Sequence, residues 1–189
     1  MEAVTATAQM TATEFLALEP HDRAARRELV DGELVVSQPT WTHNSAQICV
    51  QARLWNWARA APDRGAAGVP LDVLLDDRNV HCPDVVWYRT GRVPERRDPP
   101  PYAVPDLVVE VRSPSTWRYD IGAKKANYER HGAAELWLVD TAADVVLVFR
   151  RSKPDVRDFD VSLELTATHT LTSPLLPGFS LPVGEIFQG

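Results

Sequence analysis

The sequence predicts a mixed α/β fold in a single domain. Three observations support this: a hairpin signal near residue 31, a long amphipathic helix pattern over residues 42–61, and apolar runs that dominate after residue 68. A chain of 189 residues with 44% hydrophobic residues is large enough to bury a full core. We expect residues 1–10 to form a disordered tail and residues 11–189 to form the domain.

The first expected elements are a short helix and a hairpin. Thr11 and Glu14 have the spacing of a capping box, which predicts a helix that follows them and ends at Pro20. Asp31 and Gly32 stand between two apolar runs. This pair favours a tight hairpin turn because both central residues need positive φ.

Residues 42–61 have the pattern of a long amphipathic helix packed on a sheet. The face that we assign to the sheet has apolar residues at helical spacing. Its members are Ile48, Ala52, Trp55 and Arg59, with Val50, Leu54 and Trp57 beside them.

The middle of the chain predicts two strands and an irregular connection. After a loop of small residues at 63–68, the runs VPLDVLL (69–75) and NVHCPDVVWYR (79–89) each read as one strand. Residues 91–105 contain five prolines, which preclude a continuous helix or a central strand. We therefore expect an exposed, charged connection there.

The last part of the chain predicts a buried strand, a helix and two more strands. The strand is DLVVEVR at 106–112, and the helix spans 120–132 with Gly132 as its stop. The runs ELWLVD and DVVLVFR follow as strands, and residues 173–187 are expected to be irregular and packed onto the body.

Composition excludes several classes of function. The formal net charge is −6, so a nucleic-acid site would have to be a local basic patch. Two distant cysteines indicate neither a disulfide framework nor structural zinc, and a reducing cytoplasm fits them. We expect no export signal and no bilayer span. No Gly-rich nucleotide motif and no Ser-His-Asp arrangement is evident.

Two carboxylates occupy strand positions where a structural sheet would prefer Val or Ile. Asp84 follows Pro83 within an apolar run, and Glu110 lies inside the apolar run DLVVEVR. A divalent metal is one partner for such acids, because Mg²⁺ takes one or two carboxylates and leaves other positions to water and substrate phosphate. The alternative is a salt bridge to an arginine.

Cations accompany these carboxylates at regular spacing. Glu110 and Arg112 are two residues apart in a strand and so share a face. Asp120, Lys124 and Tyr128 follow one another at single helical turns. Phosphodiester hydrolysis needs a cation to steady the attacking water and to offset transition-state charge. The alternative for Lys124 is a solvated lysine paired with Asp120.

The paired acids also predict an effect on stability. If Asp84 and Glu110 are held close together, their like charges repel each other unless a metal is bound. We therefore expect Asp84→Asn to stabilise the metal-free protein.

Together these motifs resemble the Uma-two family of restriction-endonuclease-like proteins in the PD-(D/E)XK superfamily. The resemblance runs from about Thr11 to Phe187. It rests on ELVDGEL, His43, CPDVVW, PDLVVEVRSPST, the helix with Asp120, Lys124 and Tyr128, HGAAELWLVD and SPLLPGFSLPVGEIF. The resemblance implies a twisted mixed sheet flanked by helices, with Asp84 and Glu110 as metal ligands at its centre. It also implies that Lys124 is the catalytic cation, moved from the strand to the following helix.

A few further residues are expected to have supporting roles at this site. Glu28 matches an acid that would complete the metal shell. Arg112 departs from the family pattern, since an apolar residue commonly stands there; it would clamp phosphate or pair with one of the carboxylates. Lys125 would also contact substrate, and Trp117 would stack on a base. His43 is expected to cap or pack the helix, with a place at the cleft as the alternative.

Two readings of function remain. The leading one is a Mg²⁺- or Mn²⁺-dependent endonuclease that acts on DNA, with Asp84 and Glu110 holding the metal and Lys124 positioning water. The other is a non-catalytic module of the same fold that binds nucleic acid or a protein partner. A homodimer is expected for cutting both strands of a duplex, because two sites related by a twofold axis are the simplest arrangement.

Overall fold

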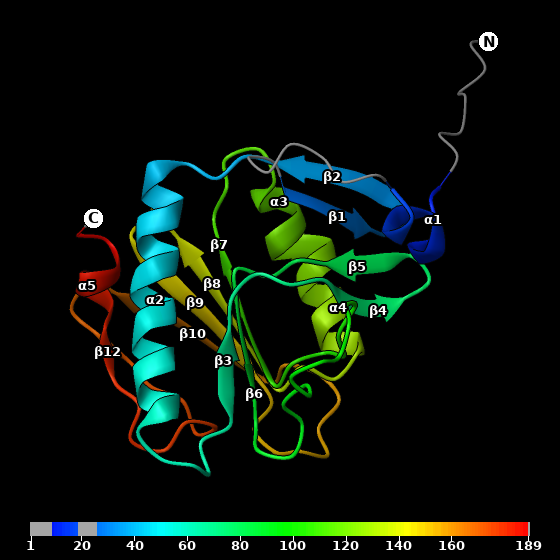
Figure 1. The fold of residues 1–189 in the computed structure, drawn as a ribbon. Coiled ribbons are helices and arrows are strands. Elements are labelled where there is room, and N and C mark those ends of the chain that lie inside the picture. Colours follow the sequence, from blue (N-terminus) through cyan, green and yellow to red (C-terminus); the bar gives the residue numbers. More distant parts are fainter. Residues whose placement is uncertain (1–8, 19–25, 189) are drawn as a thin grey trace.

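Two sheets, a long helix and a shorter helical segment make up the body of the molecule (Figure 1). The computed structural model describes residues 9–18 and 26–188, so the expected tail at 1–10 lies mostly outside the described residues. The helical elements are α1 (Ala12–Leu16), α2 (Trp41–Arg59), α3 (Trp117–Tyr119), η1 (Asp120–Lys124), α4 (Lys125–Arg130) and α5 (Val183–Ile186). The strands are β1 (Arg26–Val30), β2 (Glu33–Ser37), β3 (Ala66–Gly68), β4 (Val73–Asp76), β5 (Asn79–His81), β6 (Val85–Tyr88), β7 (Leu107–Val111), β8 (Glu135–Asp140), β9 (Val145–Arg150), β10 (Val161–Thr166), β11 (Thr170–Leu171) and β12 (Leu181–Pro182).

The small sheet is antiparallel and contains the predicted hairpin. Its order is β2-β1-β5-β4, and the β1–β2 turn places Asp31 and Gly32 at φ values of 49° and 83°. The capping box of Thr11 and Glu14 is also present at the start of α1. Helix α1 ends at Leu16, earlier than expected, and Pro20 lies outside the described residues.

The large sheet is mixed, as predicted. Its order is β10-β9-β8-β7-β6-β3; β7 and β8 are parallel, and the other neighbours are antiparallel. Two of its strands were not anticipated. Strand β3 lies within the expected loop at 63–68, and β10 falls in a stretch without an assigned element. The tail contributes β11, β12 and α5, so it is less irregular than expected.

The prediction of one strand over residues 79–89 is wrong. The chain leaves the small sheet after His81 and enters the large sheet at Val85, so the run forms β5 and β6 in different sheets. Pro83 lies at the break, and because it lacks an N–H it cannot continue a ladder. Asp84 is therefore held at the junction of the two sheets, where its N–H donates to the Val109 carbonyl at 3.0 Å.

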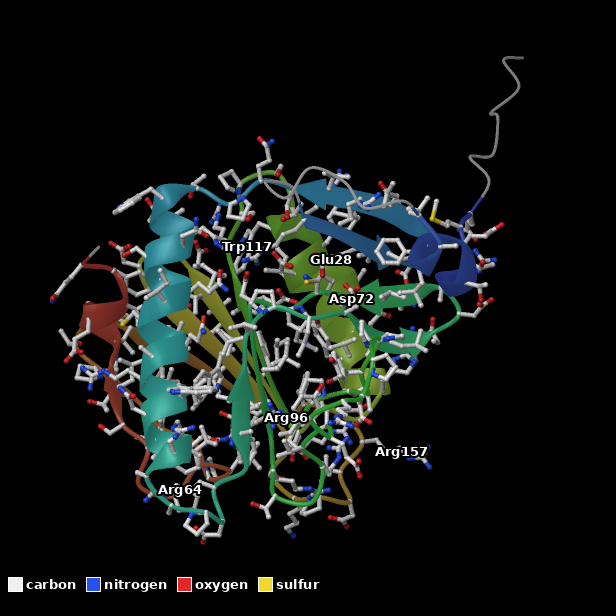
Figure 2. All side chains as sticks on the ribbon, viewed as in Figure 1. Glu28, Arg64, Asp72, Arg96, Trp117 and Arg157 are labelled. Carbon is white, nitrogen blue, oxygen red and sulfur yellow. The ribbon has the colours of Figure 1, made fainter. Side chains whose placement is uncertain are left out.

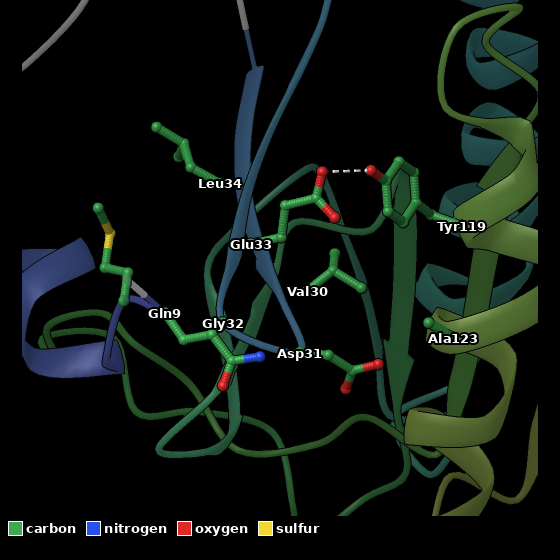
Figure 3. Close-up of a pocket in the computed structure, with 9 residues that line it drawn as sticks. Gln9, Val30, Asp31, Gly32, Glu33, Leu34, Tyr119 and Ala123 are labelled. Carbon is green, nitrogen blue, oxygen red and sulfur yellow. Dashed lines mark hydrogen bonds between the residues drawn. The ribbon is translucent and has the colours of Figure 1, made fainter. Parts of the chain in front are cut away.

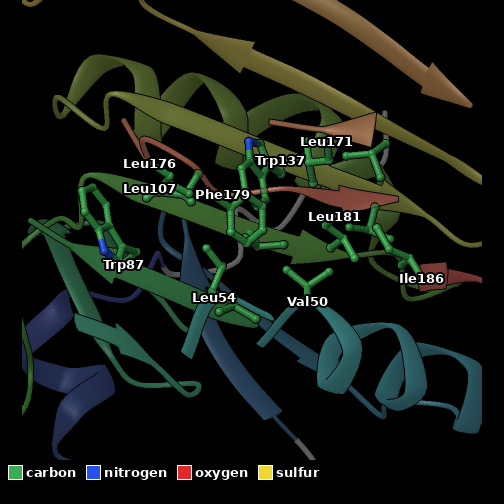
Figure 4. Packing of buried hydrophobic residues seen from close by; sticks show 14 of the residues in the cluster. Val50, Leu54, Trp87, Leu107, Trp137, Leu171, Leu176, Phe179, Leu181 and Ile186 are labelled. Carbon is green, nitrogen blue, oxygen red and sulfur yellow. The ribbon is translucent and has the colours of Figure 1, made fainter. Parts of the chain in front are cut away.

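The face that we assigned to the packing side of α2 is also wrong. Val50, Leu54 and Trp57 turn toward the large sheet, whereas Ile48 and Trp55 are 64% and 47% exposed. Figure 4 shows Val50 and Leu54 in the apolar layer between α2 and the sheet, together with aromatic side chains from other elements. Both stripes have helical spacing, so periodicity alone could not tell which one faces inward.

The second helical segment runs without interruption from Trp117 to Arg130 and connects the parallel strands β7 and β8. It packs on the face of the sheet opposite to α2, where Tyr128 contacts the core with Val108 and Leu138. Gly132 follows its end at φ 92°, as predicted for a helix stop.

The proline-rich connection at 91–105 is largely exposed, as expected. Among the described residues, no helix is both long and apolar enough to cross a membrane.

Candidate active site

Four carboxylates line one small pocket where the two sheets meet the second helical segment. Glu28 comes from β1, Asp84 from the β5–β6 junction, Glu110 from β7 and Asp120 from η1, and each is at most 7% exposed. Figure 2 shows Glu28 where the hairpin meets this helical segment. The free volume of the pocket is about 10 Å³, close to the space of one water-sized sphere. The structure thus brings Asp84 and Glu110 to the same pocket.

Lys124 lies at the centre of three of these carboxylates. Its Nζ is 2.9 Å from Glu28 Oε1, 2.8 Å from Glu110 Oε1 and 3.1 Å from Asp120 Oδ1. Burial by itself lowers the pKa of Lys124, but the three carboxylates raise that pKa well above its ordinary value. The ammonium group therefore stays protonated at neutral pH. Lys124 is not a solvated surface lysine, although its expected pairing with Asp120 is present.

A π-helical turn places Lys124 and Asp120 in the pocket. Residues 120–124 form this wider turn between two α-helical segments. Such turns are rare and frequent at functional sites. The i,i+4 ion pair between Asp120 and Lys124 spans the turn, so both side chains point into the same space.

Asp84 has its own set of partners. Oδ1 forms an ion pair with the Arg26 guanidinium and lies 3.2 Å from His43 Nε2, while Oδ2 accepts the Val111 N–H at 2.6 Å. Gln47 donates to the Asp84 carbonyl at 3.0 Å. Burial alone would raise the pKa of Asp84, but His43, Arg26 and the Val111 amide hold that pKa below its ordinary value. Asp84 is therefore ionised.

For Glu110 and Asp120 the pKa is shifted in the opposite direction, upward. Burial raises the pKa of Glu110 well above its ordinary value; Lys124 opposes this, and Glu28, Asp120 and Asp84 reinforce it. The Tyr128 hydroxyl donates to Glu110 Oε1 at 2.7 Å. Burial likewise raises the pKa of Asp120 to about 6 against the opposing charge of Lys124. Loss of water is the main cause of both upward pKa shifts, and the neighbouring carboxylates add to it.

The pocket is therefore short of positive charge. Among the described residues, its lining contains four carboxylates, and only Arg26 and Lys124 carry permanent positive charge. When all four carboxylates are ionised, Arg26 and Lys124 compensate two of the four negative charges. This shortfall corresponds to the charge of one divalent cation.

The contacts of Asp84 predict the opposite of the stabilisation that we expected from Asp84→Asn. Arg26 and His43 already stabilise the Asp84 carboxylate, so neutralising it would remove favourable interactions. The cost of repulsion falls on Glu110 and Asp120, whose pKa values are raised.

Three predicted substrate contacts lie outside the pocket lining. Arg112 Nη1 is 2.8 and 3.0 Å from the two carboxylate oxygens of Asp140, so its acidic partner is neither Asp84 nor Glu110. Its guanidinium carbon lies 5.5 Å from the centroid of the half-buried Trp117 ring. Lys125 Nζ lies 4.7 Å from the centroid of the Phe149 ring, on the apolar side of its helix. Arg112 and Trp117 are sequence neighbours of Ser113 and Thr116, which do line the pocket.

Sequence reasoning missed some members of the pocket. Arg26 was not singled out, although Arg26 and Glu28 are two residues apart in β1 and so share a face. Gln47 was also missed; it does not line the pocket, but it accepts a hydrogen bond from Arg26 and lies one turn after His43 on α2. His43 is 2% exposed and does lie in the pocket, as the alternative for this residue proposed.

A second, larger hollow of about 740 Å³ lies between the hairpin and η1 (Figure 3). The Tyr119 hydroxyl bridges it by donating to Glu33 Oε1 at 2.7 Å. Asp31 and Glu33 supply its charged lining, and within residues 9–18 and 26–188 no lysine or arginine lines it. The hollow therefore lacks the clustered acids and cations of the smaller pocket.

Comparison with known proteins identifies the family of the chain and its fold. The Uma2 family model, described as "Putative restriction endonuclease", matches residues 12–184. The chain belongs to the Uma-two family. A crystal structure of "a putative nuclease belonging to DUF820" from Anabaena variabilis superposes with a TM-score of 0.76 at 19% identity, covering 94% of this chain and 97% of that one. No curated protein matches. The restriction-endonuclease-like fold is thereby established, and membership of the Uma-two family supports a nuclease-like function.

Proposed function

We propose that this Uma-two protein is a metal-dependent endonuclease that hydrolyses phosphodiester bonds in DNA. One observation carries the proposal: a buried pocket lined, in the part of the chain that the structure describes, by four carboxylates and only two permanently charged cations. A desolvated pocket with unbalanced negative charge binds a cation to recover the lost solvation. The nuclease-like family supports nucleic acid as the substrate.

The donor set suits Mg²⁺ or Mn²⁺. Asp84 and Glu110 supply hard carboxylate oxygens, and Mg²⁺ needs only one or two of these because it keeps several waters. Among the described residues, no group of three or more His, Cys, Asp or Glu side chains is arranged to hold a metal. Glu28, as a third ligand, would have to give up contacts with Lys124 and with the Cys82 N–H. A bound divalent ion would activate the attacking water and stabilise charge on the phosphate.

The surrounding side chains have separate roles in this proposal. Lys124, protonated because of its three carboxylate neighbours, orients the attacking water and offsets charge that develops on phosphate. It cannot serve as the base. Tyr128 orients Glu110, and His43 orients Asp84. Arg112, Lys125 and Trp117 are proposed to contact the phosphate backbone and a base as substrate enters.

A non-catalytic module is the second candidate, and one observation favours it. Each of the four carboxylates already has a cationic partner, either Lys124 or Arg26. A pocket that only stabilises the fold needs no further ion. The endonuclease requires a divalent ion whose binding depends on Asp84, whereas the non-catalytic module requires no such ion.

Cleavage assays test the proposal directly. Circular and linear DNA are incubated with the protein in Mg²⁺, Mn²⁺ or chelator, using wild type, Asp84→Ala, Glu110→Gln and Glu135→Gln. Glu135 is the matched control because it is also a fully buried strand glutamate, but its partners are Trp137 and Ser173, away from the pocket. We expect metal-dependent cleavage by wild type and Glu135→Gln only. Cleavage by Asp84→Ala or Glu110→Gln at the wild-type rate would refute the assignment.

Calorimetric titration with Mn²⁺ separates the two candidates. Heat of binding that is lost in Asp84→Ala supports the metal site even if the correct DNA substrate has not been found. Wild-type protein that binds no divalent ion and cleaves no DNA would favour the non-catalytic module.

A further inference from the structure

The outer face of α2 carries a row of exposed apolar side chains. Trp41, Ile48 and Trp55 are 82%, 64% and 47% exposed. They are spaced seven residues apart, so they lie along one side of the helix. This row, which we call the α2 stripe, faces away from the sheet and has no role in the pocket chemistry. Exposed apolar patches of this kind mark interaction surfaces.

The α2 stripe has the spacing of a helix that packs against another helix. Ser45, Ala52 and Arg59 fill the positions between the large residues, so the steps alternate between four and three residues. This average of 3.5 residues is the repeat of two helices packed side by side. Along the stripe each large apolar residue is followed by a small one or, at the end, by a flexible arginine.

The stripe is complementary to itself in the antiparallel direction. A twofold axis at the level of residue 50 places Ile48 opposite Ala52 of a second copy. It also places Trp55 opposite Ser45, and Trp41 opposite Arg59. At each level along the paired helices, a large side chain then faces a small or flexible one. The twofold axis repeats each of these contacts, as in any isologous interface. We propose that the α2 stripe is a dimer interface in which two copies of this chain pair their α2 helices antiparallel about residue 50.

The C-terminal end of α2 offers a place for the incoming tryptophan. A hollow of about 420 Å³ is lined there by Trp55, Arg59 and a set of small residues that includes Ala58, Ala60 and Ala66. The Arg59 guanidinium carbon lies 5.5 Å from the centroid of the Trp55 ring. In the paired arrangement Trp41 of the second copy reaches this end, so that Arg59 contacts one ring from each copy through cation–π interactions.

A second copy fits this face better than nucleic acid does. Arg59 is the only charged residue in the stripe, and the neighbouring Arg53 is paired with Glu185. Nucleic-acid surfaces neutralise several phosphates, whereas the cores of protein interfaces are depleted in charge and rich in aromatic residues. Each tryptophan that becomes buried contributes about 150–250 Å² of buried surface. The stripe alone would therefore bury an area at the small end of the range for specific protein interfaces, which is typical of a reversible dimer.

Sedimentation velocity over a range of protein concentrations tests the proposal. Wild type should shift from the 21.1 kDa monomer toward twice that mass as concentration rises. Ile48→Lys and Ala52→Glu should each remain monomeric. An equimolar mixture of the two should recover a dimer at low salt, because the introduced lysine of one copy faces the introduced glutamate of the other. Asn56→Lys is the matched control: it adds the same charge at an exposed α2 position outside the stripe and should dimerise like wild type.

Two checks keep the result decisive. The altered side chains at 48 and 56 are exposed, so equal melting temperatures for those variants and wild type exclude misfolding as the cause of a monomer. Wild type that stays monomeric, Ile48→Lys that still dimerises, or a mixture that fails to recover a dimer would each overturn the proposed pairing. If wild type is monomeric and Trp41→Ala weakens binding of single-stranded DNA, the stripe contacts nucleic acid instead.

Discussion

The charge shortfall in the pocket predicts that Asp120→Asn stabilises the metal-free protein. Asparagine has nearly the same shape as aspartate and keeps an oxygen that accepts a hydrogen bond from Lys124, which lies 3.1 Å from Asp120 Oδ1. The substitution removes one of four negative charges. Because burial and like charges disfavour the ionised form of Asp120, removing its charge should favour folding.

The size of the effect follows from the pKa shift. Burial raises the pKa of Asp120 from 3.8 to about 6, so the folded protein holds this proton more tightly than the unfolded chain does. Ionising Asp120 therefore lowers the free energy of unfolding. This loss is absent below pH 3.8, grows as the pH rises toward 6, and is complete above pH 6. A difference of about 2 pKa units corresponds to roughly 3 kcal/mol. For a domain of this length, that free energy would raise the melting temperature by roughly 6–12 °C.

Urea unfolding in chelator at pH 4, 6 and 8 measures this effect. Asp120→Asn should be as stable as wild type at pH 4 and more stable by about 3 kcal/mol at pH 8. Asp84→Asn is the contrasting control: the pKa of Asp84 is lowered, so its carboxylate stabilises the fold above pH 3.8 and its loss should destabilise the protein at pH 8. Saturating Mg²⁺ should narrow the gap between Asp120→Asn and wild type, because the metal stabilises the wild-type fold. A less stable Asp120→Asn at pH 8 in chelator would refute the argument from uncompensated charge.

Three further predictions concern single side chains. Lys124→Met leaves three carboxylates without their shared cation, so urea unfolding should show a free energy of unfolding lower by about 3–5 kcal/mol. The kcat on DNA should also fall severely, and a wild-type kcat would exclude Lys124 as the catalytic cation. Arg112→Lys keeps the charge beside Asp140 but loses the planar fork, so steady-state kinetics should show a higher KM at constant kcat, and a fall in kcat alone would contradict that role. Gly65→Ala should lower the free energy of unfolding by more than about 1 kcal/mol in urea, because φ is 66° and a Cβ would collide with the Tyr88 carbonyl. Gly122→Ala is the control: the space around Gly122 is open, so this change should not destabilise the protein.

Local chemistry accounts for the parts of the fold that were predicted correctly. The Thr11–Glu14 capping box and the Asp31-Gly32 turn depend on contacts within a few residues of sequence, so short patterns identify them. Apart from Glu110, strand β7 is apolar because both of its faces are covered, and its composition already indicates this. The two acids of the candidate site stood out because each interrupts an apolar run.

The errors arise where burial depends on distant partners. Helix α2 has two stripes with helical spacing, and only its packing against the sheet shows that Val50 and Leu54 face inward while Ile48 and Trp55 face solvent. The run through Cys82 and Asp84 has the composition of one strand. It divides because its two halves pair with different strands, β5 with β1 and β4, and β6 with β7 and β3.

The same distinction applies to the candidate site. The identity of Asp84, Glu110 and Lys124, and the one-turn spacing of Asp120 and Lys124, are visible in the sequence. Their partners are not, because Arg26 is 58 residues from Asp84 and Glu28 is 96 residues from Lys124 along the chain. Only the tertiary structure brings these charges within 4 Å of one another, and the pKa of each group depends on the charges around it and on the loss of water. Sequence patterns therefore identify the chemical groups of this pocket, whereas their ionisation states and the balance of charge among them follow from the way the sheets pack against each other.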